Sequence, residues 1–297
     1  MENIQTKPSS KKVFITGATG NVGMEILKQL KIQDSELLFF AGVRHLDSDS
    51  IKLQGYPVVP LNFDFLDIST HKPALMGMHI LFLLRPPQIS QVGPYFLSII
   101  KVAREVGIQF ILFVSVQGVE KSSLIPHYKI EKEILQSGIN YCFLRPAYFM
   151  QNFTTSLRRD LIQKNRLILP AGSAQFTLLD VEDLALVSLN VIHNPDFYLN
   201  SKMDLTSNDL LRFPEMATLL STVLGRRIKF NSPSLLKFFI QKRLEGRPTA
   251  YILVLIMLHY LPRFQKAPKP SPWVRSILGR EPQNFESFID RNRKLLE

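Results

Sequence analysis

The stretch Thr16–Gly23 reads TGATGNVG and decides the fold that the sequence predicts. Apolar and β-branched residues precede it in Lys12–Thr16 (KVFIT), as in a buried strand. Asn21–Leu30 then carries apolar side chains at helical spacing, and the apolar run Leu37–Val43 follows as a second strand. Strand, glycine-rich loop, helix and second strand in this order are typical of the first βαβ unit of a Rossmann domain.

The three glycines of this stretch have separate tasks in such a domain. Gly17 permits a tight turn, Gly20 lets the backbone approach a pyrophosphate, and Gly23 lets the helix pack closely against the strand. The first turn of the helix directs free amides at phosphate oxygens. We therefore predict that these glycines bind a dinucleotide cofactor. The residues that complete the predicted binding loop are Thr19, Asn21 and Val22.

The end of the second strand indicates which dinucleotide binds. An NAD site usually places Asp or Glu there to hold the ribose 2′-hydroxyl, whereas an NADP site has an Arg nearby. Here the strand ends at Val43 and is followed by Arg44 and His45, with no acid before Asp47. The planar guanidinium of Arg44 can pair with a 2′-phosphate. The sequence therefore favours NADP(H), with NAD(H) as the less favoured cofactor.

Apolar strands continue to alternate with amphipathic helices as far as Asn200. Nearly continuous apolar strands are typical of a parallel sheet that is buried on both faces. The predicted class is therefore α/β, with a doubly wound parallel Rossmann sheet. The further predicted strands are Val58–Leu61, His79–Leu84, Gln109–Ser115 and Asn140–Leu144, and the further helices are Pro94–Val106 and Pro126–Gln136.

Ligands of such sheets lie beyond the carboxyl ends of the strands, which draws attention to three more residues. Asp64 follows the third strand, where a carboxylate can accept a hydrogen bond from an adenine amino group. Leu84 and Arg85 end the fourth strand and are expected beside the middle of the cofactor. Each of these residues could instead serve only its own loop.

The pattern changes after Asn200 and becomes mainly helical. A helix is expected to begin near Leu205–Asp209, to run through Phe213–Leu224 and to stop at Gly225. The longest apolar run, Ala250–Leu261, is too short for a bilayer core, which needs about 20 residues. We interpret it as a core or oligomer helix. The predicted domains are 11–201, which binds NAD(P), and 202–297, a smaller and mostly helical substrate or cap domain.

Charge and composition exclude several classes of protein. The formal net charge is +11, and residues 226–297 alone hold 15 Lys and Arg against 5 Asp and Glu. These cations are scattered and match no nucleic-acid-binding motif, so nucleic acid is an unlikely partner. The only cysteine is Cys142, and the histidines lack metal-ligand spacing, so neither a disulfide nor a metal site is expected. No signal peptide or membrane span precedes the first strand, and a cytoplasmic protein is expected.

Four stretches together resemble the NmrA-like group of atypical short-chain dehydrogenases/reductases. They are TGATGNVG, the HxxxE of His127 and Glu131 followed by Gly138, LRPAYFMQN at 144–152, and FTLLDVEDLA at 176–185. The similarity spans nearly the whole chain. It implies a Rossmann domain with a small C-terminal substrate domain. It also implies cofactor contacts from the glycine loop, from Arg44, from the loop after the fourth strand and from Ala147, Tyr148 and Phe149.

Two alignments of the catalytic residues remain open. Short-chain dehydrogenases use Tyr and, four residues later, Lys, with a Ser about 13 residues before the Tyr, a spacing that Ser115, Tyr128 and Lys132 fit. The alternative alignment places His127 at the lysine position. We favour it because Glu131 then follows at the spacing seen in extended members. Lys132 lies about 100° around the helix from Glu131, and so away from the helix face that His127 and Glu131 share.

The predicted function follows from these residues and from the resemblance. We expect an NADPH-dependent reductase of a quinone-like small-molecule acceptor, in which His127 binds the nicotinamide ribose and the protein orients the two reacting rings. The alternative is a non-catalytic NAD(P)H sensor of the NmrA type that binds a protein partner. An epimerase or dehydratase would require the Ser115, Tyr128 and Lys132 alignment. The protein is expected to be a monomer or a homodimer.

Overall fold

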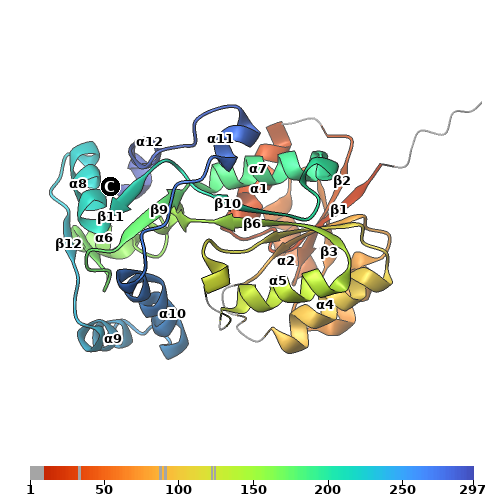
Figure 1. The fold of residues 1–297 in the computed structure, drawn as a ribbon, viewed down its shortest axis with the longest axis horizontal. Coiled ribbons are helices and arrows are strands. Elements are labelled where there is room, and N and C mark those ends of the chain that lie inside the picture. Colours follow the sequence, from red (N-terminus) through yellow and green to blue (C-terminus); the bar gives the residue numbers. More distant parts are fainter. Residues whose placement is uncertain (1–9, 33–34, 87–88, 90–91, 122, 124) are drawn as a thin grey trace, which may run out of the picture. The chain divides into compact units, whose positions relative to one another are not determined.

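The computed structural model describes residues 10–32, 35–86, 89, 92–121, 123 and 125–297 (Figure 1). The chain forms two compact units. Unit 1 contains the residues up to Arg145 and Ala185–Met203, and unit 2 contains Pro146–Leu184 and Asp204–Glu297. Unit 2 thus takes in residues 146–184 as well as the C-terminal part. The sequence instead predicts one domain boundary, between residues 201 and 202.

Unit 1 is built on a seven-stranded sheet in the order β10-β6-β5-β4-β1-β2-β3. The pairings from β3 through β2, β1, β4 and β5 to β6 are all parallel. Every residue of β5 is buried, as expected for a strand covered on both faces. The strands are β1 Lys12–Ile15, β2 Leu38–Val43, β3 Val58–Asn62, β4 Ile80–Leu84, β5 Phe110–Val114, β6 Asn140–Pro146 and β10 Ser201–Leu205.

Helices cover both faces of this sheet, with α1 and α7 on one face and α4 and α5 on the other (Figure 1). The α4 and α5 side is held by a buried cluster that includes Phe96, Phe113, Ile130 and Phe143. The predicted α/β class with a doubly wound Rossmann sheet is confirmed. The helices are α1 Asn21–Ile32, α2 Leu46–Leu53, α3 His71–Leu75, α4 Gly93–Glu105, α5 Pro126–Ser137 and α7 Val181–His193.

Unit 2 is mostly helical but also contains two small sheets, in the orders β11-β9-β7 and β12-β8. Aromatic side chains, among them Phe153, Phe213 and Phe285, dominate its core. Its strands are β7 Tyr148–Phe149, β8 Arg166–Ile168, β9 Gln175–Leu179, β11 Leu210–Arg212 and β12 Lys229–Asn231. Its helices are α6 Arg158–Lys164, α8 Phe213–Leu224, α9 Leu235–Leu244, α10 Thr249–Tyr260, α11 Trp273–Leu278, α12 Phe285–Arg291 and α13 Arg293–Leu296.

Short 3-10 helices complete the described elements. They lie at Ile68–Thr70, Val119–Lys121, Met150–Asn152, Pro195–Tyr198 and Leu261–Phe264. Within the described ranges, no helix combines the length and apolar character that crossing a bilayer requires.

The expected helix start at 205–209 is wrong. The chain is extended in β10 and again in β11, and α8 begins only at Phe213. A capping box explains this start, because the backbone N–H of Arg212 donates to the carboxylate of Glu215 at 2.6 Å. The carboxylate of Asp209 instead accepts the backbone N–H of Phe285 at 2.7 Å, so it ties down α12 rather than capping α8.

Asp180 and Asp183, the two aspartates of the FTLLDVEDLA stretch, have structural roles in unit 2. Asp180 accepts the backbone N–H of Glu182 at 2.9 Å and so caps α7. Asp183 is fully buried and accepts the guanidinium of Arg280 and the backbone N–H of Gln283, both at 2.7 Å. Burial raises the pKa of Asp183 above its usual range.

Candidate functional site

The glycine loop between β1 and α1 requires glycine at two of its positions, Gly17 because of its left-handed backbone and Gly23 because a side chain has no room there. Gly17 has a φ of +65°, and a Cβ there would lie 3.1 Å from Cδ2 of Leu84. A Cβ on Gly23 would lie 2.3 Å from the carbonyl oxygen of Gly17 and 2.6 Å from Cα of Ala18. The first turn of α1 therefore rests directly on the backbone of the loop.

The same packing leaves the first amides of α1 without partners inside the helix. The backbone N–H of Gly20 donates to the carbonyl of Gly17 at 3.0 Å, and that of Met24 donates to the carbonyl of Gly20 at 2.8 Å. The amides of Asn21, Val22 and Gly23 precede the regular helical bonding and point out of the helix end. Gly20 and Asn21 are exposed. This exposed cradle fits a phosphate group.

Thr16 joins the glycine loop to the carboxyl end of β4. Its hydroxyl accepts the backbone N–H of Leu84 at 2.8 Å and donates to the carbonyl of Phe82 at 3.2 Å. The side chain of Leu84 lies against Gly17. The structure thus brings together two elements that the sequence predicts to contact the cofactor.

Arg44 lies at the carboxyl end of β2, where the sequence predicts it. Its side chain is exposed and makes no salt bridge with any residue that the structure describes. Of the acids that follow, Asp47 is exposed, whereas Asp49 accepts the backbone N–H of His45 at 3.3 Å and pairs with Lys52 at 2.7 Å. The guanidinium of Arg44 is therefore available to an anionic ligand at this edge of the sheet.

Asp64 serves its own loop. Its carboxylate accepts the backbone N–H of Leu66 at 2.9 Å, its N–H donates to the hydroxyl of Thr70 at 3.0 Å, and its carbonyl lies 3.2 Å from Nε2 of His71. These contacts account for an Asp at this position without a ligand. The adenine contact stays a prediction.

Arg85 and His127 form a hydrogen-bonded pair between the end of β4 and the start of α5. Nε of Arg85 donates to Nε2 of His127 at 3.3 Å, and Nη1 of Arg85 donates to the carbonyls of Pro86 and Ile89 at 3.1 and 2.6 Å. The His127 ring also lies 6.0 Å from the Phe113 ring, between centroids. Burial and the charge of Arg85 lower the pKa of His127 to about 3. His127 is therefore neutral near pH 7, with its proton on Nδ1.

Ser115 supplies a buried polar atom that the described residues leave unsatisfied. It follows β5 directly and is 4% exposed, and its backbone N–H donates to the carbonyl of Leu144 at 2.7 Å. Its Oγ has no hydrogen-bond partner within the described ranges. Buried hydroxyls nearly always find a partner, so this one fits a site that a ligand completes.

The orientation of α5 bears on both catalytic alignments. Glu131 is buried and is held by Arg145, whose Nε and Nη2 donate to its two carboxylate oxygens at 3.0 and 2.7 Å. His127 and Tyr128 are both half-buried, and Lys132 is exposed. Among the described contacts, no hydrogen bond links Tyr128 or Lys132 to Ser115. His127 lies one turn before Glu131, on the side of α5 that contacts Arg85, and the choice between the two alignments stays a prediction.

Ala147, Tyr148 and Phe149 belong to unit 2 and are placed there by other contacts. The backbone N–H of Ala147 donates to the carbonyl of Leu205 at 2.9 Å. The hydroxyl of Tyr148 lies 3.1 Å from Nε2 of His259, whose Nδ1 lies 2.7 Å from the Leu255 carbonyl and donates to it. Burial raises the pKa of Tyr148 and lowers that of His259 to about 4. Sequence reasoning missed His259, because 111 residues separate it from Tyr148.

Metal ligands do not gather anywhere in the described part of the chain, where no three His, Cys, Asp or Glu side chains form a cluster.

The low pKa of His127 predicts a loss of stability in mild acid. The unfolded chain takes up a proton near pH 6.5, whereas the folded chain does so only near pH 3. The contribution of His127 to the free energy of unfolding is therefore fully present above about pH 6.5, and it is lost as the pH falls towards 3. Between pH 7 and pH 5 the loss is about 2 kcal/mol.

This prediction is checked by urea unfolding of the unchanged protein and of His127→Asn at both pH values. The variant keeps an acceptor for Arg85 but cannot titrate, and His259 is present in both chains, so their difference isolates His127. Equal pH dependence in the two proteins would contradict the prediction.

Comparisons with known proteins show which family this chain is similar to. The model of the NmrA-like family matches residues 9–258. Prestalk A differentiation protein A of Dictyostelium discoideum is 26% identical over 96% of this chain and 94% of its own length. Agroclavine dehydrogenase of Claviceps fusiformis is 25% identical over 95% of this chain and 98% of its own length.

Solved structures share the fold. The NADPH-dependent quinone oxidoreductase of Escherichia coli, in complex with NADPH, superimposes with a TM-score of 0.82 at 20% identity and covers 94% of this chain and 99% of its own. The negative transcriptional regulator NmrA, in complex with NAD, gives a TM-score of 0.75 at 16% identity and covers 97% of each chain.

Proposed function

The chain belongs to the NmrA-like family, and on that premise we propose that it is an NADPH-dependent reductase of a planar, quinone-like small-molecule acceptor. One observation carries the proposal: the glycine loop leaves an exposed phosphate cradle at the start of α1, on the sheet edge where Arg44 also lies. Relatives that bear the names of dehydrogenases and oxidoreductases support an enzymatic role.

In this proposal, different residues of unit 1 bind different parts of the cofactor. The amides of the glycine loop and of the first turn of α1 would hold the pyrophosphate. Arg44 would pair with the 2′-phosphate, which requires NADP(H) rather than NAD(H). Solved relatives in complex with NADP(H) support this choice. Leu84 and Arg85 would lie beside the middle of the cofactor, and Asp64 beside the adenine.

The inward end of α5 would hold the nicotinamide side. NADPH, when bound, supplies a hydride to an acceptor placed against its nicotinamide ring. Arg85 fixes the His127 ring by donating to Nε2, which leaves Nδ1–H free to donate to a ribose hydroxyl. Ser115 can satisfy its buried hydroxyl on the same ligand. The neutral imidazole orients the ligand and is a weak proton donor, so a quinone that accepts the hydride would take the one further proton it needs from water.

Turnover tests the proposal. Purified protein is expected to oxidise NADPH when a panel of small quinones is added, and His127→Ala should lower kcat/KM by roughly tenfold, the loss of one hydrogen bond to a ligand. Tyr128→Phe and Lys132→Ala are the matched controls on the same helix and should retain activity. If these two variants lose activity and His127→Ala does not, the Ser115, Tyr128 and Lys132 alignment replaces the one proposed.

A second candidate function is a redox sensor that binds the dinucleotide and regulates a protein partner. The exposed position of Lys132 favours it, because the Tyr–Lys pair of active short-chain dehydrogenases is then not assembled. One solved relative is a negative transcriptional regulator in complex with NAD. Stoichiometric NADPH binding without consumption across the quinone panel would favour this function. In either function we propose a cytoplasmic monomer or homodimer.

A further inference from the structure

Helix α10 of unit 2 carries no side chain that is charged near pH 7, and most of its apolar surface is exposed. Its twelve residues, TAYILVLIMLHY, include no Lys, Arg, Asp or Glu. Only Ile252 and His259 are buried, whereas Leu253 is 55% and Leu258 43% exposed. A helix that is apolar all round is normally buried. The sequence suggested a core or oligomer helix, and the structure shows that the core takes only one side of it.

Helix α9, which contacts α10 and precedes it by a four-residue link, adds a second apolar stripe. Leu236, Ile240 and Leu244 recur every four residues and are 70%, 50% and 85% exposed. The opposite side of α9 is anchored by the buried Phe238 and Lys242. We call these three α9 residues together with Leu253, Val254, Met257, Leu258 and Leu261 the apolar face; all eight are exposed.

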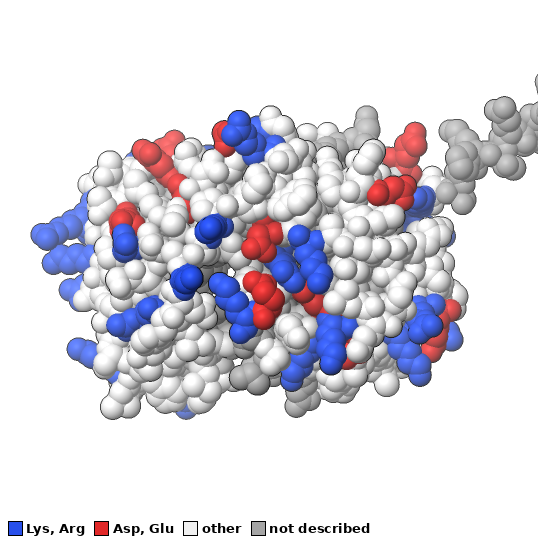
Figure 2. All heavy atoms as spheres, in the orientation of Figure 1, with Lys and Arg blue, Asp and Glu red and all other residues white. Residues whose placement is uncertain are grey.

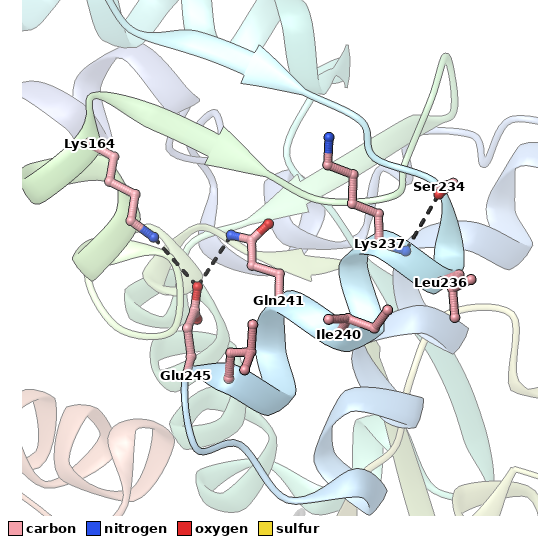
Figure 3. Close-up of a pocket in the computed structure, with 8 residues that line it drawn as sticks. Lys164, Ser234, Leu236, Lys237, Ile240, Gln241 and Glu245 are labelled. Atoms are coloured by element: carbon pink, nitrogen blue, oxygen red, sulfur yellow. Dashed lines mark hydrogen bonds and ion pairs between the residues drawn. The ribbon is translucent and has the colours of Figure 1, made fainter.

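A shallow hollow runs along the α9 part of this face (Figure 3). Leu236 and Ile240 lie on one side of it, and a polar group of Lys164, Gln241 and Glu245 lies on the other. The carboxylate of Glu245 is occupied there, because it accepts from Lys164 at 3.5 Å and from Lys242 at 2.8 Å. The acid beside the apolar face is therefore neutralised within unit 2.

The segment of the chain that contains the apolar face is strongly cationic. Residues 232–279 contain eight Lys or Arg and one acid, Glu245. Six of these cations are exposed and make no salt bridge with any described residue. In Figure 2 the surface over the α9 and α10 region is largely white with blue at its edges. The six are Lys237, Arg243, Arg247, Arg263, Lys266 and Lys269.

Charge decides between the possible occupants of this surface. A second copy of the chain would place the same cations opposite one another across a two-fold axis, where they repel. A nucleic acid would satisfy the cations but not the eight exposed apolar side chains. The interface of an anionic bilayer satisfies both, since leucines enter the acyl boundary while Lys and Arg meet the headgroups.

We propose that α9 and α10 seat the protein on the surface of an anionic lipid leaflet, with the apolar face in the interface and the six cations on the headgroups. The helices lie on the leaflet and do not cross it, in keeping with their lengths of 10 and 12 residues. The inference stands apart from the proposed reductase activity, because it uses none of the residues of unit 1.

Vesicle sedimentation with the full chain tests the proposal. The protein is expected to sediment with vesicles of phosphatidylcholine and phosphatidylserine, and far less with phosphatidylcholine alone. The double variants Leu253→Ser/Leu258→Ser and Lys237→Glu/Arg243→Glu should each weaken partitioning by about tenfold or more. Leu135→Ser is the matched control, because Leu135 on α5 is also 43% exposed. Equal NADPH titration and unfolding curves would show that all variants are folded.

Two outcomes would overturn the proposal. One is a concentration-dependent dimer in light scattering that Leu253→Ser/Leu258→Ser dissociates, together with no sedimentation on either vesicle. The other is equal partitioning to both vesicles that the Lys237→Glu/Arg243→Glu variant leaves unchanged. Neither bears on NADPH binding or turnover, so failure here is distinguishable from failure of the proposed function.

Discussion

Gly23→Ala is expected to abolish dinucleotide binding and to lower the free energy of unfolding by about 3 kcal/mol, at the upper end of the cost of overpacking. The added Cβ would lie 2.3 Å from the Gly17 carbonyl oxygen and 2.7 Å from the carbonyl carbon of Ala18. Both are backbone atoms, so no side chain can rotate away. Helix α1 must then retreat from the loop and carry its free amides out of reach of a phosphate.

Gly93→Ala is the matched control for this variant. Like Gly23 in α1, Gly93 lies in the first turn of a helix, where it is the first residue of α4. A Cβ on Gly93 would meet nothing within 4 Å. The control should leave NADPH binding unchanged and unfold no more easily than the unchanged protein. Urea unfolding and NADPH titration of both variants make the comparison. Normal affinity in Gly23→Ala would show that close packing at this position does not hold the cradle together.

Arg44→Ala is expected to weaken NADPH binding by about 1–3 kcal/mol, roughly a 5- to 150-fold rise in Kd, and to leave NADH binding nearly unchanged. The guanidinium has no carboxylate partner among the described residues, so its removal costs little stability. Its whole effect should therefore appear in the recognition of the 2′-phosphate.

Isothermal titration with NADPH and with NADH measures this difference directly. Arg104→Ala removes an exposed arginine from α4 in the same unit and is the control for a general change of charge. Equal losses for both dinucleotides in Arg44→Ala would mean that Arg44 does not read the 2′-phosphate.

The first half of the fold was predictable because its signals are local. The βαβ unit from Lys12 to Val43 shows its strands, loop and helix in consecutive residues, and the structure reproduces them to within two residues. Helix α2, Leu46–Leu53, was not predicted, because LDSDSIKL has only three apolar side chains. Strand β10 was missed for another reason: its place beside β6 depends on pairing with residues about 60 positions away, as Tyr141 and Asn200 illustrate.

The positions of the candidate site residues on the fold were predictable to the same extent, whereas their roles stay predictions. Glycine spacing and strand ends identify the cradle, Arg44 and Arg85, because the carboxyl ends of parallel strands meet at one edge. The choice between His127 and the Tyr128–Lys132 pair could not be made from spacing alone. It depends on which way α5 faces, and the pair of the buried Glu131 with Arg145 on β6 holds the Glu131 side of the helix inward. No pattern in the sequence pairs those two residues.

Calorimetric titration of the unchanged full chain with NADPH decides whether the glycine loop is a pyrophosphate site. The exposed amides at the start of α1, together with an Arg44 that makes no salt bridge with any described residue, predict saturable binding of one NADPH per chain, tighter than that of NADH. If neither the reduced nor the oxidised nicotinamide dinucleotides show saturable binding to the folded protein, the assignment of the glycine loop as a pyrophosphate site is wrong.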